Sequence, residues 1–215
     1  MRTLSRARLG VRAMLIMIGL VLFAGCTWSS SPVHFYMLAQ PLPATSTAPS
    51  AEALRGPTIG IGPVTLPRYL ERINIVTRGN TEMEVSEYDR WAEPLNASVP
   101  RLLAGDLSAM LDTERIVMFP WAVETTIDRQ IVVDVLRFEG TMAGEVVLDA
   151  RWRVLGPARQ ELVLQHSVVR ETAGANGYPA VVSAMRRAVS VLSREIAEAV
   201  KRLPVSSAPS RAPDA

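Results

Sequence analysis

Three long segments in the second half of the chain alternate between apolar and polar residues. They run from Arg129 to Phe138, from Glu145 to Leu155 and from Glu161 to Glu171. A period of two predicts β-strands with one packed face and one face in water. Gly140 to Gly144 and Gly156-Pro157 separate the segments with residues typical of turns, so the pattern predicts an antiparallel meander. In the middle segment the expected packed face is Val146, Leu148, Ala150, Trp152 and Val154, and the expected wet face is Asp149, Arg151 and Arg153.

Two other segments repeat apolar residues every three or four positions, which predicts amphipathic helices. The first begins near Asn96 or Ser98, either of which can cap a helix. The second runs from about Pro179 to Leu203, and packing on its own sheet is favoured over a coiled coil. The expected apolar positions are Val99, Leu102, Leu103, Leu107, Met110 and Leu111 in the first, and Val181, Met185, Ala188, Leu192, Ile196, Ala199 and Leu203 in the second.

Shorter elements precede the meander. Pro67 to Glu71 is expected to form one helical turn with proline at its start. Asp89 to Leu95, which holds Trp91, is expected to be an irregular stretch that leads into the first helix. The fold class is therefore α/β: a mixed β-sheet with a C-terminal antiparallel meander, packed by two main helices. The expected short strands are Thr58–Val64, Ile73–Arg78, Glu82–Val85, which forms a hairpin through Gly79-Asn80, and Ile116–Phe119.

The N-terminal residues have the layout of a secretory signal. Four arginines and no acid precede an apolar run from Ala13 to Phe23, which is short of the roughly 20 residues that span a membrane comfortably. Ala24-Gly25-Cys26 then resembles a bacterial lipobox, in which the cysteine thiol is acylated and the chain is cut before it. Phe23 departs from the leucine preferred at its position. The alternatives are an uncleaved anchor or ordinary secretion.

These features divide the chain into four parts. We expect a lipoprotein signal peptide at residues 1–25, a lipid-anchored tether at 26–56, the folded domain at 57–203 and a disordered tail at 204–215. Within the tether, His34 to Leu38 is a short apolar cluster. It is expected to dock on the domain as an extended strand, with membrane-proximal slack as the alternative.

Charge excludes one class of partner. The whole chain has a formal net charge of +2, but the leader holds four arginines and no acid, so the mature chain is near −2. A nucleic-acid-binding domain would need a basic stripe, so no nucleic-acid partner is expected.

The sequence contains no recognisable catalytic motif. The two histidines, His34 and His166, lie far apart, and neither has a cysteine beside it, which argues against zinc. Gly60 and Gly62 are not followed by the residues of a phosphate-binding loop. Asp128, Asp134 and Glu139 are interpreted as solvated strand-face carboxylates rather than paired catalytic acids. We therefore predict a non-enzyme with no cofactor and no metal.

Five stretches, in this order and spacing, carry a family resemblance: Phe35–Leu38, Ile59–Leu70, Ile75–Arg78, Arg90–Leu95 and Arg137–Glu139. With them the chain resembles the PqiC/YmbA-type auxiliary lipoproteins of ABC-type lipid transport. The resemblance implies a periplasmic domain similar to the N-terminal domain of TolB. It also implies two partners, an MCE-domain protein and an integral membrane transport component, which move phospholipid or other hydrophobic molecules across the envelope.

Two segments are candidate partner-binding sites. Arg90, Trp91 and Glu93 place a rigid indole between charges, which suits an interface, although Trp91 equally suits the core beneath the helix. The second candidate segment contains Pro67, Arg68 and Tyr69.

The predicted function is a lipid-anchored accessory subunit that docks a lipid-transfer assembly at a membrane. The alternative is a structural or assembly lipoprotein, a pilotin-like envelope tether that never meets transported lipid. Direct lipid binding by the domain would need a sizeable apolar cavity. The expected location is the periplasmic face of a Gram-negative envelope. The outer membrane is favoured because Thr27, not aspartate, follows the cysteine. A homo-oligomer is possible.

Overall fold

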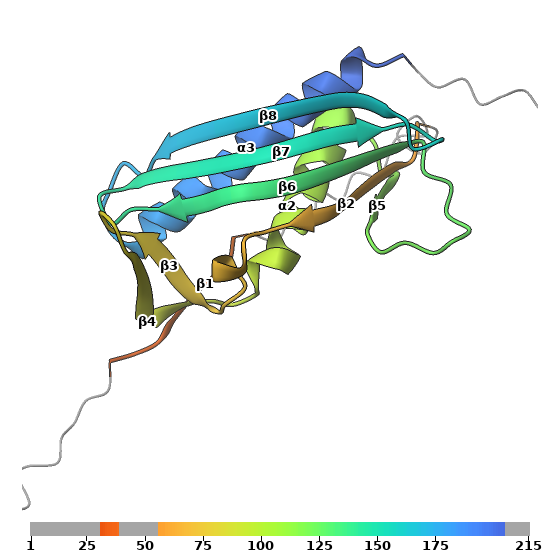
Figure 1. Ribbon diagram of the computed structural model, residues 1–215. Coiled ribbons are helices and arrows are strands. Elements are labelled where there is room, and N and C mark those ends of the chain that lie inside the picture. Colours follow the sequence, from red (N-terminus) through yellow and green to blue (C-terminus); the bar gives the residue numbers. More distant parts are fainter. Residues whose placement is uncertain (1–30, 39–55, 205–215) are drawn as a thin grey trace, which may run out of the picture. The chain divides into compact units, whose positions relative to one another are not determined.

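The computed structural model describes residues 31–38 and 56–204, which form one mixed sheet and two long helices (Figure 1). The predicted signal peptide, most of the predicted tether and nearly all of the predicted tail lie outside these residues. Among the described residues, no helix combines the length and apolar character needed to cross a bilayer. The elements are β1 (His34–Tyr36), β2 (Ile59–Thr65), the 3-10 turn η1 (Arg68–Leu70), β3 (Asn74–Arg78), β4 (Met83–Trp91), α2 (Leu95–Leu111), β5 (Ile116–Met118), β6 (Arg129–Gly140), β7 (Glu145–Leu155), β8 (Glu161–Thr172) and α3 (Tyr178–Arg202).

The predicted meander is confirmed. β6, β7 and β8 pair antiparallel along almost their whole length. Their inward positions alternate as the sequence pattern required, and Trp152 on β7 is 1 % exposed, with its indole N–H donating to Ser167 Oγ at 2.9 Å. Burial of such a row of apolar side chains is the main stabilising term of the domain.

Both helices cover one face of the sheet, and the other face stays open (Figure 1). α3 begins with Pro179 in its first turn, where a missing N–H costs nothing, and its apolar stripe from Val181 to Ala199 lies in the core. The N-cap of α2 is Pro94, two residues before Asn96 and four before Ser98, so neither expected residue caps the helix, which ends at Asp112 in a left-handed conformation. Ser190 Oγ on α3 donates to Asp106 Oδ2 on α2 at 2.7 Å and ties the helices together.

Strand β6 organises the sheet because two different strands share its second edge. β2 runs parallel to its first half, from Arg129 to Asp134, and β3 meets it at Gly140. β5 extends the sheet beyond β2, and β4 and β1 extend it beyond β3. The turn η1 lies between β2 and β3 in the sequence. It therefore connects the two strands that pair with the same edge of β6.

The apolar cluster from His34 to Leu38 docks on the domain as a strand, as expected. β1 pairs parallel with the end of β4, so that Tyr36 lies opposite Trp91. Leu38 is 2 % exposed, and Tyr36 Oη donates to Asp89 Oδ1 at 2.9 Å. Burial, followed by this hydrogen bond, raises the pKa of Tyr36 to about 12, so the phenol stays a donor. The sheet therefore includes a strand that precedes the predicted domain start at residue 57.

One expected element is wrong. The stretch Asp89 to Trp91 is not irregular, because it forms the end of strand β4. The physical reason is its partner: β1 supplies a second ladder for these residues, and a propensity argument on the local sequence contains no information about that distant strand.

Candidate partner-binding site

A buried carboxylate joins several elements on the open face of the sheet. Glu139, near the end of β6, has a side chain only 1 % exposed. Arg78 of β3 donates from Nη2 to Glu139 Oε2 at 3.0 Å and from Nε to Oε1. Arg137 Nε donates to the same Oε1, and Tyr69 Oη of η1 donates to Oε2 at 3.2 Å. We call Tyr69, Arg78, Arg137 and Glu139 the Glu139 cluster.

Electrostatics keep this carboxylate ionised. Burial alone would raise the pKa of Glu139, but the hydrogen bonds and charges of Arg78 and Arg137 together outweigh burial and lower it below its usual range. The same cluster raises the pKa of Tyr69, first through burial and then through the charge of Glu139. The cluster is therefore a charge-assisted joint that holds η1, β3 and β6 in one arrangement.

Further charges extend from the cluster across the open face. Thr65 Oγ1 donates to Asp134 Oδ1 at 2.6 Å, and His166 Nε2 lies 2.7 Å from Asp149 Oδ1. Arg137, Arg151, Arg153 and Arg170 also lie on this face. Of them, Arg151, Arg153 and Arg170 are exposed and make no ion pair with any residue that the structure describes.

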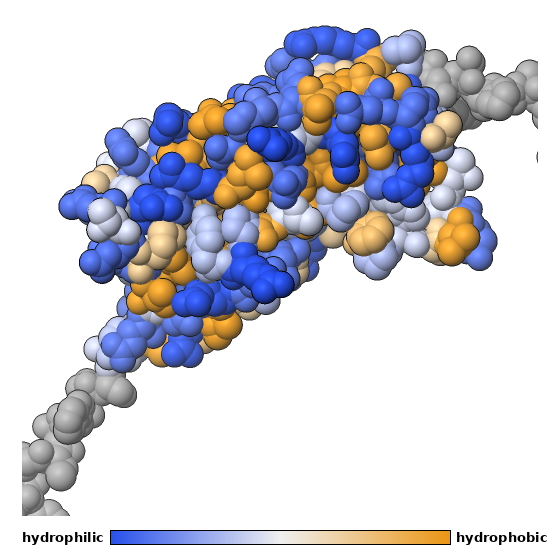
Figure 2. All heavy atoms as spheres, viewed as in Figure 1, coloured by the Kyte–Doolittle hydropathy of each residue, from blue (hydrophilic) through white to orange (hydrophobic). Residues whose placement is uncertain are grey.

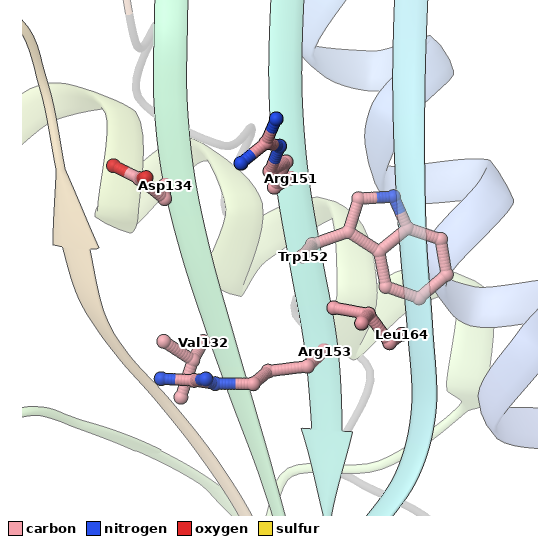
Figure 3. Close-up of a pocket in the computed structure, with 6 residues that line it drawn as sticks. All are labelled: Val132, Asp134, Arg151, Trp152, Arg153 and Leu164. Carbon is pink, nitrogen blue, oxygen red and sulfur yellow. The ribbon is translucent and has the colours of Figure 1, made fainter.

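Two of these arginines border a shallow depression of about 170 Å³ between β6, β7 and β8 (Figure 3). Figure 3 shows Arg153 reaching across towards Val132 of β6, with Arg151 above it and Leu164 of β8 at the other side. Leu164 is 62 % exposed and Val168 is 48 % exposed. Figure 2 shows hydrophobic and hydrophilic residues interspersed over the open face. Unpaired guanidinium groups beside exposed aliphatic side chains are typical of protein interfaces.

The first predicted site segment does not form an exposed loop. Trp91 is 4 % exposed and belongs to the hydrophobic core, which favours its interpretation as a core residue. Glu93 forms an ion pair with Arg101 of α2. Arg90 is half-buried on β4, and its Nε has no hydrogen-bond partner in the described residues.

The second predicted segment lies at the Glu139 cluster. Pro67 occupies the position before η1 with φ −58°, Arg68 is exposed, and Tyr69 is half-buried with its hydroxyl on Glu139. The structure thus brings together three of the stretches that carry the family resemblance: those that contain Tyr69, Arg78 and Arg137.

Sequence reasoning missed Glu139 itself. Its interpretation as a solvated strand-face carboxylate is wrong, because the side chain is on the open face as expected but is covered by its partners. Arg137 could have indicated the ion pair, because residues two apart on a strand share a face. Asp134 is exposed, as expected, and Asp128 accepts the backbone N–H of Thr58 at 2.8 Å.

A second depression, of about 430 Å³, lies where α2 and α3 end beside the start of β2. Its lining mixes apolar side chains such as Leu111 and Leu203 with Arg129 and Lys201. Among residues 31–38 and 56–204, no three side chains of His, Cys, Asp or Glu gather as a metal site would require.

The fold and its surface define a class: a small mixed α/β domain with one helix-covered sheet face and one open, charged face. The model of the ABC-type transport auxiliary lipoprotein component family matches residues 36–197. The chain belongs to this family, which confirms the resemblance seen in the sequence.

Solved structures agree on the fold. A crystal structure of an uncharacterised protein has a TM-score of 0.64 at 19 % identity, over 79 % of this chain and 99 % of the other. A Xanthomonas campestris protein has a TM-score of 0.60 at 14 % identity, over 77 % of this chain and 93 % of its own. No curated protein sequence matches the chain.

Proposed function

We propose that this protein is the lipid-anchored periplasmic accessory subunit of an MCE-type, ABC-type lipid transport system, and that it docks the transfer assembly at a membrane. Its family, described as an auxiliary lipoprotein component of ABC-type transport, supports the transport role. The observation that carries the docking role is the open sheet face, where unpaired arginines stand beside exposed Leu164 and Val168.

The proposed contact surface runs from η1 to β8. Pro67, Arg68 and Tyr69 form one end, and Arg151 and Arg153 form the other. Arginine is enriched among the few interface residues that carry most of the binding energy, where the surrounding contacts exclude water. In this proposal the segment of Arg90, Trp91 and Glu93 supports the surface from the core and does not contact the partner.

We further propose that the protein is not an enzyme and that Cys26 holds it at the outer membrane, with the domain in the periplasm. The MCE-domain protein is the proposed direct partner, and the integral membrane component is part of the same assembly.

The test is capture of the MCE-domain protein of the same genome by the acylated protein in detergent. We expect Arg151→Ala with Arg153→Ala to weaken capture by at least about tenfold, since loss of a hot-spot residue costs about 2 kcal/mol or more. The matched control is Arg194→Ala with Lys201→Ala, which removes the same charge from exposed positions of α3.

If the variant with both arginines replaced captures the partner as well as the wild type does, the open face is not the contact surface. If the wild-type protein captures no MCE-domain protein, the proposed function fails and a purely structural envelope lipoprotein takes its place. Melting temperatures of both variants should match that of the wild type, which excludes unfolding as the cause.

A further inference from the structure

The edge strand β1 presents apolar side chains to solvent on one face. Val33, Phe35 and Met37 are 39 %, 62 % and 51 % exposed. Alternate residues of a strand point to the same face, while Tyr36 and Leu38 point into the domain and pack there. All three therefore keep more than a third of their surface exposed, on the outermost strand of the sheet on its side.

An unpaired cation stands beside them. Phe35 lies opposite Arg90 in the β1–β4 register, and residues opposite each other in a ladder share a face. Arg90 makes no ion pair among the described residues, and its buried Nε has no partner. An apolar row with one arginine at its side matches the interface of a phospholipid bilayer, where aliphatic and aromatic groups enter the acyl boundary and a guanidinium group binds phosphate.

The short distance along the chain from Cys26 to these side chains favours the lipid bilayer as the surface that they contact. Val33 follows Cys26 by seven residues, and a fully extended chain spans at most about 25 Å over that length. In an acylated lipoprotein the lipid anchor itself sits in the membrane, so this row can never move far from it. We propose that Val33, Phe35, Met37 and Arg90 form a second membrane-contact site, which seats the β1 edge on the phospholipid headgroup region. We call these four residues the β1 patch.

The consequence is a fixed orientation of the domain. A single tether leaves the domain free to rotate, whereas a tether and a nearby contact define an axis. The proposal rests on the acylation of Cys26 in the proposed function but not on the transport partner. Its failure can be told apart from failure of the proposed docking, because partner capture in detergent measures a different property.

The experiment uses the acylated full-length protein in vesicles of phosphatidylethanolamine and phosphatidylglycerol. Cys26 is the only cysteine and is blocked by acylation, so one introduced cysteine carries a unique environment-sensitive dye. Phe35→Cys is the test position and Leu164→Cys the matched control, because both native side chains are 62 % exposed. The two probes are nitroxide-labelled phospholipid, which quenches from the bilayer, and iodide, which quenches from water.

We expect the dye at position 35 to be quenched by the nitroxide lipid and shielded from iodide, and the dye at position 164 to show the reverse. Iodide quenching at both positions would overturn the proposal, since the domain would then be tethered but not seated. Equal lipid quenching at both positions would overturn it as well, because the whole sheet face would lie on the membrane. Protection of position 35 from both quenchers would mean that protein covers the patch, and would also overturn it.

A second variant separates contact from mere proximity. A protein with the dye at Met37→Cys is compared with one that also carries Phe35→Ser. We expect Phe35→Ser to lower the ratio of membrane-contacting to merely tethered domains by about tenfold, since a partly buried phenyl ring contributes about 1.4 kcal/mol or more. Lipid quenching at position 37 that does not change with Phe35→Ser would show that the tether alone holds the strand there.

Discussion

Substituting Glu139 by glutamine tests whether the Glu139 cluster holds the open face together. The side chain is 1 % exposed and accepts three hydrogen bonds from arginines and one from Tyr69. Glutamine keeps the shape and one acceptor oxygen but removes the charge that both guanidinium groups face.

The magnitude follows from the exposure of the partners. A hydrogen bond to a charged group contributes about 1.5–3 kcal/mol, and breaking a fully buried ion pair costs about 3–5 kcal/mol. Arg78 and Arg137 are 36 % and 40 % exposed, so water recovers part of their interactions when the charge is lost. We therefore expect Glu139→Gln to lower the free energy of unfolding by about 2 kcal/mol, which corresponds to about 4–8 °C in melting temperature.

The assay is urea unfolding of wild type, Glu139→Gln and the control Glu161→Gln, which changes an exposed glutamate without an ion pair among the described residues. The control should stay within about 0.5 kcal/mol of wild type. Equal stability of the two variants would refute the reasoning, because the Glu139 cluster would then contribute nothing measurable to the free energy of unfolding.

The same measurement has a definite pH dependence. The pKa of Glu139 is lower in the folded protein than its ordinary value of 4.5, so the contribution of the carboxylate is fully present above about pH 4.5. It is lost as the pH falls through the lower folded value. The stability gap between wild type and Glu139→Gln should therefore close in acid and stay constant from pH 6 to 8; a gap that is unchanged at low pH would contradict the assigned charge.

Three further predictions concern the core, the sheet and the anchor. Trp91→Ala should destabilise the domain by about 3–5 kcal/mol in urea unfolding, as expected for a buried tryptophan, and near-native stability would contradict its core position. Gly140→Ala would place a Cβ 2.5 Å from Val181 Cγ1, so we expect a loss of about 1–3 kcal/mol, part of which Val181→Ala in the same chain restores; no loss would mean that α3 shifts freely. Cys26→Ala should abolish incorporation of radiolabelled palmitate, and label that persists on the variant would show that Cys26 is not the acylation site.

The meander and both helices could be predicted because each depends on a local repeat. A period of two over β6, β7 and β8, and a period near 3.6 over α2 and α3, decide which residues face the core before any distant contact forms. The stripe from Val181 to Ala199 illustrates this, since its expected members are buried except for Leu203, which is partly exposed at the end of the helix.

The cluster and the end of β4 could not be predicted in the same way. Strict alternation from Ile131, Val133 and Val135 would place Glu139 on the packed face, and the register shift between Val135 and Arg137 turns it to the open face. Its burial there depends on Arg78 and Tyr69, which come from other elements. Trp91 was ambiguous for the same reason, because the end of its strand forms between β3 and β1, two segments that lie elsewhere in the sequence. Local patterns specify the direction of a side chain, whereas its exposure depends on which chain segments arrive beside it.

The three-residue strand β1 also determines how much chain separates Cys26 from the folded domain. With the lipid on Cys26, as proposed, the seven residues from Cys26 to Val33 hold the start of β1 within about 25 Å of that lipid while β1 is paired with β4. Short edge strands open at a small fraction of the global unfolding free energy. Once β1 leaves the sheet, the chain from Cys26 to Ile59 becomes the connection and reaches about 110 Å when fully extended. One local opening event therefore changes the radius over which the anchored domain can search for a partner by about fourfold.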